Sequence, residues 1–380
     1  MERPPPDPMT PARAAPPLAL VVPFHNEERY LPVLIESLRG QRGHNVPVVF
    51  IDNGSSDRSR LLVERCAEVA AGTWLCASEP RVGKFHAMKT GTALCVEQFG
   101  ARYVAFVDAD SYCADVDWLR RGAETVELGQ GDLGYVYSPF RYYGFEHLPI
   151  FARAYRAYEE VLILLLERIG WLANGQGFVA AAETLTRYFE AAQVTAEIDL
   201  RVSLLALAEG LRVYLNPSFI MTSARRIVVN SQNFAAWCFY DRSFYSGKDI
   251  NAPRKLDLDA PAVVNDLQPN LVGRFFARRA LKLVARHLLP LAIFDSHAIA
   301  QARIGTVLGV DLTRQTLTAF APFTRTTDYL FTGRFEAMVH AIENHPVSAA
   351  LARRIENLMH ARYSAYVHPS AGPAAATSPA

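Results

Sequence analysis

Residues 103–110 read YVAFVDAD, an apolar run that continues without alternation into the carboxylates of Asp108 and Asp110. Such a run is typical of a parallel strand buried on both faces, and ligands bind beyond the carboxyl ends of such strands. Carboxylate oxygens are ligands that Mg²⁺ and Mn²⁺ prefer, with water and phosphate oxygens completing the shell. The segment therefore predicts a buried strand that ends in a metal site, the alternative being that Asp110 caps a following helix.

Two earlier apolar runs also end in polar clusters. Residues 18–24 (LALVVPF) lead into His25, Asn26 and Glu27, and residues 47–52 (PVVFID) lead into an Asn-Gly-Ser-Ser-Asp turn. Helical spacing of apolar residues separates the runs. We therefore predict an α/β fold, a mostly parallel sheet flanked by helices, with its functional face at the strand ends. The expected elements are strands at 18–24, 47–52, 73–77 and 103–107, and helices at 31–38, 59–71 and 84–98.

The rest of the chain is expected to be mixed at first and then mainly helical. The mixed part is predicted to have strands at 135–140, 174–181 and 211–215, and helices at 146–170 and 197–208. The polar stretch 246–259 sets the boundary between the two parts. We expect a disordered Pro/Ala-rich leader at 1–17, a folded domain at 18–250, a helical region at 251–366 and a disordered tail at 367–380.

The composition argues against several classes of protein. Lys plus Arg is 39 and Asp plus Glu is 38, and a net charge of +1 does not favour nucleic-acid binding. The five cysteines include no C-x-x-C pair, which argues against a disulfide framework or a cysteine zinc site and favours the reducing cytoplasm. No apolar run reaches the roughly 18 residues that span a bilayer. We expect a cytoplasmic protein, with the inner face of the membrane as the alternative location.

Four segments, in this order, resemble the family 2 glycosyltransferases, which have the GT-A fold. They are VVPFHNEERYLPVLIESL at 21–38, VVFIDNGSSDRS at 48–59, RVGKFHAMKTG at 81–91 and YVAFVDAD at 103–110. The resemblance extends over about 18–230 and leaves the C-terminal third unmatched. It implies a GT-A catalytic domain at 18–250, Rossmann-like, with a nucleotide-binding half at 18–110 and an acceptor half at 111–250.

The resemblance also implies roles for individual residues. A divalent metal, Mn²⁺ or Mg²⁺, would be held by Asp110 and Asp108. The nucleotide sugar would contact Pro23, His25, Glu27, Asp52, Asn53, Lys84, Asp108, Ala109, Gly175, Arg225 and Arg226. Five of these predictions have structural alternatives: Glu27 as a helix cap, the Asn53 turn as ordinary turn chemistry, Lys84 as an exposed first-turn lysine, Gly175 as a residue that simply permits a turn, and the two arginines as a solvated pair.

The catalytic base is expected near residue 197. The family places a G-E-D-x-D-L-like segment at the start of a helix, and its Asp acts as the base. Here the corresponding residues are Thr195-Ala196-Glu197-Ile198-Asp199-Leu200, which puts Glu197 at the base position. Asp199 is the alternative, and Glu197 as a simple first-turn acid is another. The family's Gly-Gly-Phe before this segment is missing, so the acceptor pocket is expected to differ.

The resemblance implies an inverting, metal-dependent glycosyltransferase that moves a sugar from a nucleotide-diphosphate sugar to an acceptor hydroxyl. The alternatives are a sugar nucleotidyltransferase and a catalytically inactive sugar-nucleotide-binding protein. A sugar nucleotidyltransferase would be expected to have a basic Gly-rich phosphate loop directly after the first strand, whereas this chain has His-Asn-Glu-Glu there. The acceptor stays open between a glycan, a lipid-linked molecule and a small molecule.

Residues 271–294 have the pattern of a basic amphipathic helix. Arg274, Arg278, Lys282 and Arg286 recur every four residues, with apolar residues on the other side. Packing on the catalytic domain is one interpretation of this helix. Peripheral contact with anionic lipid and formation of a homodimer are the others.

Overall fold

The computed structural model describes residues 18–42, 46–129, 133–144, 177–192, 198–208 and 211–225, together with residues 346, 347, 350 and 354. The chain divides into two compact units. The first unit contains residues 1–139, 174–189 and 211–220, and the second contains 140–173, 190–210 and 221–380. The predicted leader, the helix at 146–170, Gly175, Glu197, Arg226, the amphipathic helix at 271–294 and the tail lie outside the described residues.

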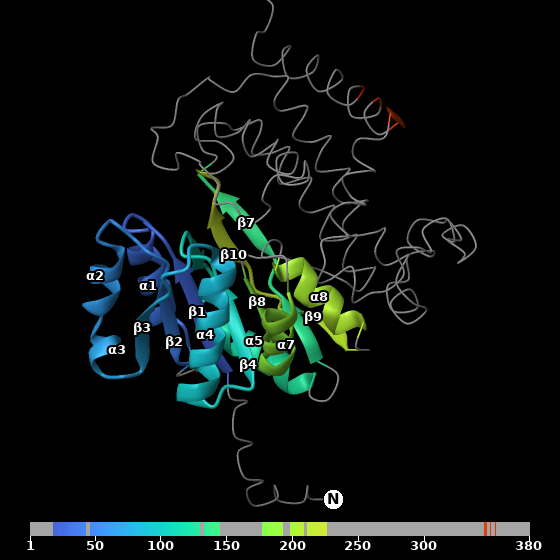
Figure 1. Ribbon diagram of the computed structural model, residues 1–380, viewed down its shortest axis with the longest axis horizontal. Coiled ribbons are helices and arrows are strands. Elements are labelled where there is room, and N and C mark those ends of the chain that lie inside the picture. Colours follow the sequence, from blue (N-terminus) through green and yellow to red (C-terminus); the bar gives the residue numbers. More distant parts are fainter. Residues whose placement is uncertain are drawn as a thin grey trace, which may run out of the picture. The chain divides into compact units, whose positions relative to one another are not determined.

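The first unit is built on a seven-stranded sheet with the order β3-β2-β1-β4-β8-β6-β9 (Figure 1). Strands β3, β2, β1 and β4 run parallel to one another, and β6 and β9 are also a parallel pair. Strand β8 is antiparallel to both of its neighbours. The strands are β1 (Leu18–Phe24), β2 (Val48–Asp52), β3 (Trp74–Ser78), β4 (Tyr103–Val107), β6 (Leu133–Tyr137), β8 (Gly177–Ala181) and β9 (Arg212–Leu215).

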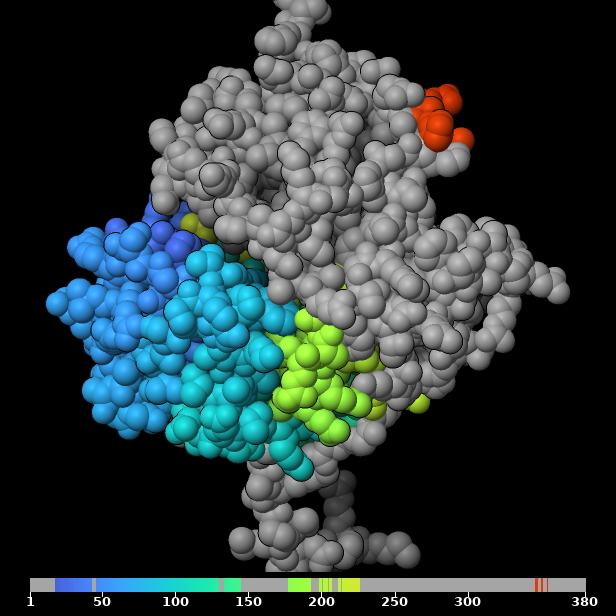
Figure 2. Space-filling model, viewed as in Figure 1, coloured from blue at the N-terminus to red at the C-terminus, as the bar shows by residue number. Residues whose placement is uncertain are grey.

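The longer helices cover the sheet through the apolar side chains that they bury. Helix α1 buries four side chains at helical spacing: Leu31, Leu34, Ile35 and Leu38. Helix α4 lies across β1 and β2, and its surface adjoins that of α7 (Figure 2). The helices of this unit are α1 (Leu31–Arg39), α2 (Ser59–Glu64), α3 (Ala67–Ala70), α4 (Lys84–Phe99), α5 (Trp118–Leu128) and α7 (Ala182–Ala191, whose last two residues belong to the second unit).

The second unit is described only in part. Its helix α8 spans Ile198–Ala208. Strand β7 (Phe140–Tyr143) and strand β10 (Ile220–Ser223) are neighbours in a smaller sheet, and the Ala224 amide donates a hydrogen bond to the Tyr143 carbonyl oxygen, 2.9 Å away.

Most of the predicted elements of the first unit are confirmed, and three details differ. The single helix expected at 59–71 is two helices, because Cys66 is extended (φ −66°, ψ 134°) and ends the first one. The strand expected at 135–140 is instead β6 followed by β7. Asp110 is not a helix cap, because Ser111–Cys113 forms the short strand β5 and α5 begins only at Trp118.

The four cysteines among the described residues are free thiols: Cys66, Cys76, Cys95 and Cys113. Burial raises the pKa of the Cys95 thiol to about 12 and that of Cys113 to about 12, so both stay protonated near neutral pH. Within the described ranges, none of the helices has the length and apolar character needed to cross a membrane.

Candidate active site

The loops after β1 and β2 are joined by side-chain contacts. Asn26 has a left-handed backbone (φ 54°), which an asparagine tolerates, and its side-chain oxygen accepts a hydrogen bond from the Ser56 amide, 2.8 Å away. The Ser55 hydroxyl accepts a hydrogen bond from the Asn26 amide at 3.0 Å, and His25 Nδ1 donates one to the Asn53 carbonyl oxygen at 2.9 Å. The two strand ends therefore form one rigid edge, and sequence reasoning missed the central place of Asn26.

Glu27 is buried between β1 and the start of α1. It is 7% exposed, and its carbonyl oxygen accepts hydrogen bonds from the amides of Tyr30 and Leu31. The first turn of α1 has no side-chain cap hydrogen bond. Glu27 thus meets the start of α1 through its backbone, and both roles predicted for its side chain stay predictions. Pro23, the other predicted contact on this segment, pairs in register with Ile51.

Asp52 ends β2 as a buried carboxylate. One oxygen, Oδ1, accepts a hydrogen bond from the Ser55 amide at 2.9 Å, which holds the turn. The other, Oδ2, lies 3.9 Å from Arg60 Nη1 of α2, with 8% of the Asp52 side chain exposed. The carboxylate is thus oriented from one side by the turn and balanced from the other by a guanidinium. Arg60 is not among the site residues predicted from the sequence.

Asn53 connects the β2 loop to the loop between β3 and α4. Its side-chain nitrogen donates hydrogen bonds to the carbonyl oxygens of Glu79 (2.9 Å) and Arg81 (2.8 Å). Its side-chain oxygen accepts one from the Gly83 amide at 2.7 Å. Gly83 has φ 130°, a conformation that L side chains rarely adopt, and α4 starts at the next residue. Asn53 therefore holds the start of α4 in place, a role beside its predicted nucleotide contact.

Glu79 is a buried acid that the sequence reasoning also missed. It is 3% exposed, and its carboxylate accepts hydrogen bonds from Arg81 Nε and Nη2, both at 2.8 Å, and from the Thr90 hydroxyl. These donors stabilise the charged form and hold the pKa of Glu79 at about 2, below its ordinary 4.5, with the Arg81 hydrogen bonds as the largest cause. The sequence signal that could have found this group is an acid and a base two residues apart, Glu79 and Arg81, directly after the third strand.

Replacing Glu79 with Gln is expected to lower the free energy of unfolding at pH 7 by about 1–2 kcal/mol, because charged hydrogen bonds to a buried group are lost. A depressed pKa stabilises the fold above the unfolded-state value and loses that effect as the pH falls from 4.5 towards 2. The difference between wild type and Glu79→Gln should therefore shrink below about pH 5, as followed by urea unfolding. Glu124→Gln, at an exposed ion pair with Arg120, is the control and should leave the free energy of unfolding nearly unchanged at pH 7 and below pH 5. A stability difference between wild type and Glu79→Gln that does not change with pH would contradict the lowered pKa of Glu79.

Asp108 and Asp110 follow β4 and occupy different environments. The Asp108 side chain is 13% exposed and forms an ion pair with Lys84, the first residue of α4. Asp110 is 4% exposed and lies between the buried residues Ala109 and Ser111. Because β4 is the parallel neighbour of β1, both aspartates leave the sheet at the edge where the β1 and β2 loops lie.

These two carboxylates fit a divalent cation of the magnesium type. Within the part of the chain that the structure describes, no cluster of three or more His, Cys, Asp or Glu side chains could enclose a metal. Mg²⁺ and similar ions are usually bound through one or two carboxylates, with waters and substrate phosphates completing the shell. A pair of aspartates matches that pattern, whereas a closed all-protein cage would need more ligands.

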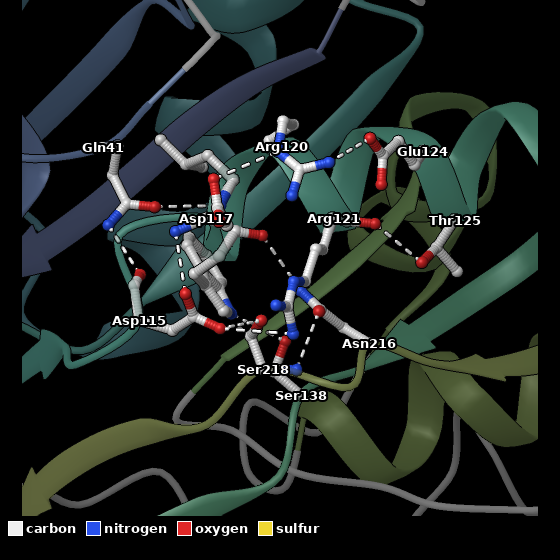
Figure 3. A network of polar contacts seen from close by, with 12 residues as sticks. Gln41, Asp115, Asp117, Arg120, Arg121, Glu124, Thr125, Ser138, Asn216 and Ser218 are labelled. Atoms are coloured by element: carbon white, nitrogen blue, oxygen red, sulfur yellow. Dashed lines mark hydrogen bonds and ion pairs between the residues drawn. The ribbon is translucent and has the colours of Figure 1, made fainter.

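The loop after β5 is anchored by the polar network in Figure 3. Asp115 Oδ2 accepts a hydrogen bond from the Ser218 hydroxyl at 2.7 Å and lies 3.4 Å from Arg121 Nη1. Gln41 Nε2 donates to the Asp115 carbonyl oxygen at 3.0 Å, which ties the loop to the end of α1. The buried Trp118 donates its ring N–H to Ser138 Oγ at 3.0 Å. The aspartates of β4 thus precede a loop held at both α1 and the 216–218 segment.

Two more of the predicted site residues belong to the second unit. Asp199 is half-buried in the first turn of α8. Arg225 is 5% exposed, so the solvated alternative for this arginine is wrong. Its backbone amide donates a hydrogen bond to the Ser223 hydroxyl at 3.2 Å. The roles predicted for both residues stay predictions, as do those of Glu197, Gly175 and Arg226, which lie outside the described residues.

Comparison with known families decides the class of this site. Residues 19–166 match the model of the family described as glycosyl transferase family 2. This stretch is similar to a family 2 glycosyltransferase domain. The match contains β1, β2, β3 and β4 and therefore every strand end described above. The matched stretch thus brings Asp52, Asp108 and Asp110 to one edge of its sheet. No curated protein matches the chain significantly.

Solved structures give more distant likenesses to the chain. S. aureus TarS is 14% identical with a TM-score of 0.43; 91% of this chain is covered, but the chain spans only 55% of the TarS length. The mannosyltransferase PcManGT from Pyrobaculum calidifontis, in complex with GDP-Man and Mn²⁺, is 18% identical with a TM-score of 0.47, covering 87% of this chain and 88% of PcManGT. Glucosyl-3-phosphoglycerate synthase from Mycobacterium tuberculosis is 17% identical with a TM-score of 0.36, covering 54% and 70%.

Proposed function

We propose that this chain transfers a sugar from a nucleotide-diphosphate sugar to an acceptor hydroxyl, with inversion at the anomeric carbon and with help from a divalent metal. The observation that carries the proposal is the position of Asp52 at the end of β2 and of Asp108 and Asp110 directly after β4, at the carboxyl ends of the two parallel strands on either side of β1, within the stretch that matches the family 2 model. Ligands of open α/β sheets bind at this edge.

The nucleotide is proposed to lie along the β1 and β2 strand ends. The buried Asp52 carboxylate can accept a hydrogen bond from a base N–H or a ribose hydroxyl through Oδ2, because Oδ1 is held by the Ser55 amide. Asp108 and Asp110 would hold the metal, which when bound supplies positive charge to the leaving diphosphate. Lys84 can add a further positive charge to the phosphates.

The acceptor is proposed to be activated by a carboxylate at the start of α8. Glu197 or Asp199 removes the hydroxyl proton, and the acceptor oxygen attacks the anomeric carbon on the face opposite the nucleotide. The bond from that carbon to the diphosphate breaks, and its electron pair leaves with the diphosphate. The first turn of a helix favours a charged carboxylate, which supports Asp199, in the first turn of α8, as the base. General base catalysis of this type is worth about 10²–10⁴ in rate.

Calorimetry with UDP and with GDP, each in Mn²⁺ and in EDTA, tests the donor site. We expect one of the two nucleotides to bind at least about tenfold more tightly with Mn²⁺, because a metal held by Asp108 and Asp110 would supply positive charge to the diphosphate. Asp52→Asn keeps the acceptor for the Ser55 amide but removes the charge, and it should weaken nucleotide binding about tenfold with or without metal. A folded protein that binds neither nucleotide would contradict the proposed donor class.

A further inference from the structure

The ion pair between Lys84 and Asp108 lies on the metal site that the proposed function requires. Lys84 Nζ contacts Asp108 Oδ1, and 42% of the lysine side chain is exposed while only 13% of the aspartate side chain is. Asp108 is therefore already neutralised by a protein cation. The lysine stem is flexible and its head reaches solvent, so the ammonium can leave Asp108 without unpacking the core.

We propose that Lys84 acts as an exchangeable cation that occupies Asp108 until donor and metal arrive together, and then moves to the donor diphosphate. This inference rests on the proposed function. The two aspartates and Lys84 carry a formal charge of −1 together, and a metal ion alone would push two like-charged cations onto Asp108. A divalent metal with a doubly charged nucleotide sugar adds no net charge, and its phosphates offer the ammonium a new partner.

The exchange makes metal and nucleotide bind as a pair. With Lys84 on Asp108, metal binding without nucleotide is weakened, because the incoming ion must compete with the ammonium for the Asp108 carboxylate. With the diphosphate present, the displaced ammonium pairs with a phosphate oxygen. Each ligand therefore strengthens the binding of the other by the same factor, as linkage requires. As a result, the metal ion stays bound at Asp108 and Asp110 only while the donor is also bound.

The test is Mn²⁺ binding to wild type and Lys84→Met, followed by electron paramagnetic resonance of free Mn²⁺, with and without saturating UDP or GDP. We expect Lys84→Met to bind Mn²⁺ about three- to tenfold more tightly without nucleotide, because Asp108 has lost its competing cation. At saturating Mn²⁺, the same variant should bind the nucleotide about tenfold more weakly, because a phosphate partner is gone. A higher affinity for Mn²⁺ alone, together with a lower affinity for the nucleotide at saturating Mn²⁺, is the result that exchange predicts.

Two variants separate this effect from simpler ones. Lys84→Arg keeps the charge and should restore weak metal binding in the absence of nucleotide. Lys89→Met makes the same chemical change in the same helix, but Lys89 Nζ donates to the Phe189 carbonyl oxygen at 3.1 Å, so metal binding should be unchanged. Circular dichroism should show all three variants folded.

The outcomes distinguish the two proposals. If wild type binds nucleotide and Mn²⁺ together but Lys84→Met leaves the affinity for Mn²⁺ alone within twofold of wild type, exchange is wrong and the donor site stands. If Lys84→Met weakens both ligands, the lysine is a structural residue and exchange is again wrong. If neither wild type nor any folded variant binds Mn²⁺ or a nucleotide, the proposed function itself fails.

Discussion

Asp110→Asn is expected to lower the rate of donor cleavage by about 10²–10³-fold, the range seen when one group that stabilises developing charge is removed. The Asp110 side chain is 4% exposed and directly follows β4, so its charge acts in surroundings that water screens little. Asparagine keeps the size and one oxygen but not the negative charge that attracts a divalent ion. The fold should therefore survive while the metal is held less tightly.

The rate is measured as nucleotide diphosphate released from the sugar donor, which needs no knowledge of the acceptor. High Mn²⁺ concentrations should partly restore Asp110→Asn, because weaker binding is overcome by mass action. Asp117→Asn is the matched control: it removes a charge from the same connection, but Asp117 pairs with Arg120 of α5, 3.1 Å away, and the rate should stay within about twofold of wild type. Full activity of Asp110→Asn at limiting Mn²⁺ would refute the metal assignment.

Gly91→Ala is expected to destabilise the protein by about 2 kcal/mol. Gly91 lies in α4 where the helix crosses β1 and β2, and an added Cβ would overlap Val21 Cγ1 and lie 3.0 Å from Val21 Cγ2 and 3.2 Å from Ile51 Cγ1. Both neighbours are fully buried and β-branched, so they have few alternative rotamers. Overpacking of this kind typically costs about 1–3 kcal/mol or more, and it exceeds the gain in helix propensity of about 1 kcal/mol.

Urea unfolding followed by circular dichroism measures the loss as a lower midpoint. Gly122→Ala is the matched control in another buried helix position, since the nearest atom to its added Cβ is Asn216 Nδ2 at 3.4 Å, an ordinary contact. That variant should be as stable as wild type or slightly more stable. Equal midpoints for Gly91→Ala and Gly122→Ala would show that α4 can move away from β1, contrary to the packing described.

The donor half of the fold could be predicted because its signals are local. Strands β1 and β4 have the bounds that their apolar runs predict, since a strand buried on both faces needs a continuous run. The break at Cys66 could not be predicted, because the helical spacing on both sides of it is continuous. The antiparallel direction of β8 was also hidden, because strand direction depends on the path of the chain between strands.

The candidate site also has a part that the sequence predicts and a part that it does not. The sequence by itself determined which carboxylates stand at or just beyond strand ends, because the polar residue that closes an apolar run marks where the buried strand stops: Asp52, Asp108 and Asp110. Only the tertiary structure decided what those groups contact. Lys84 pairs with Asp108, 24 positions away, and Asn53 bonds to Gly83, 30 positions away. The burial of Glu79 likewise depends on contacts between segments that are far apart in the sequence. Contacts of this range are set by how helices and strands pack, and no local pattern of residue types encodes that packing.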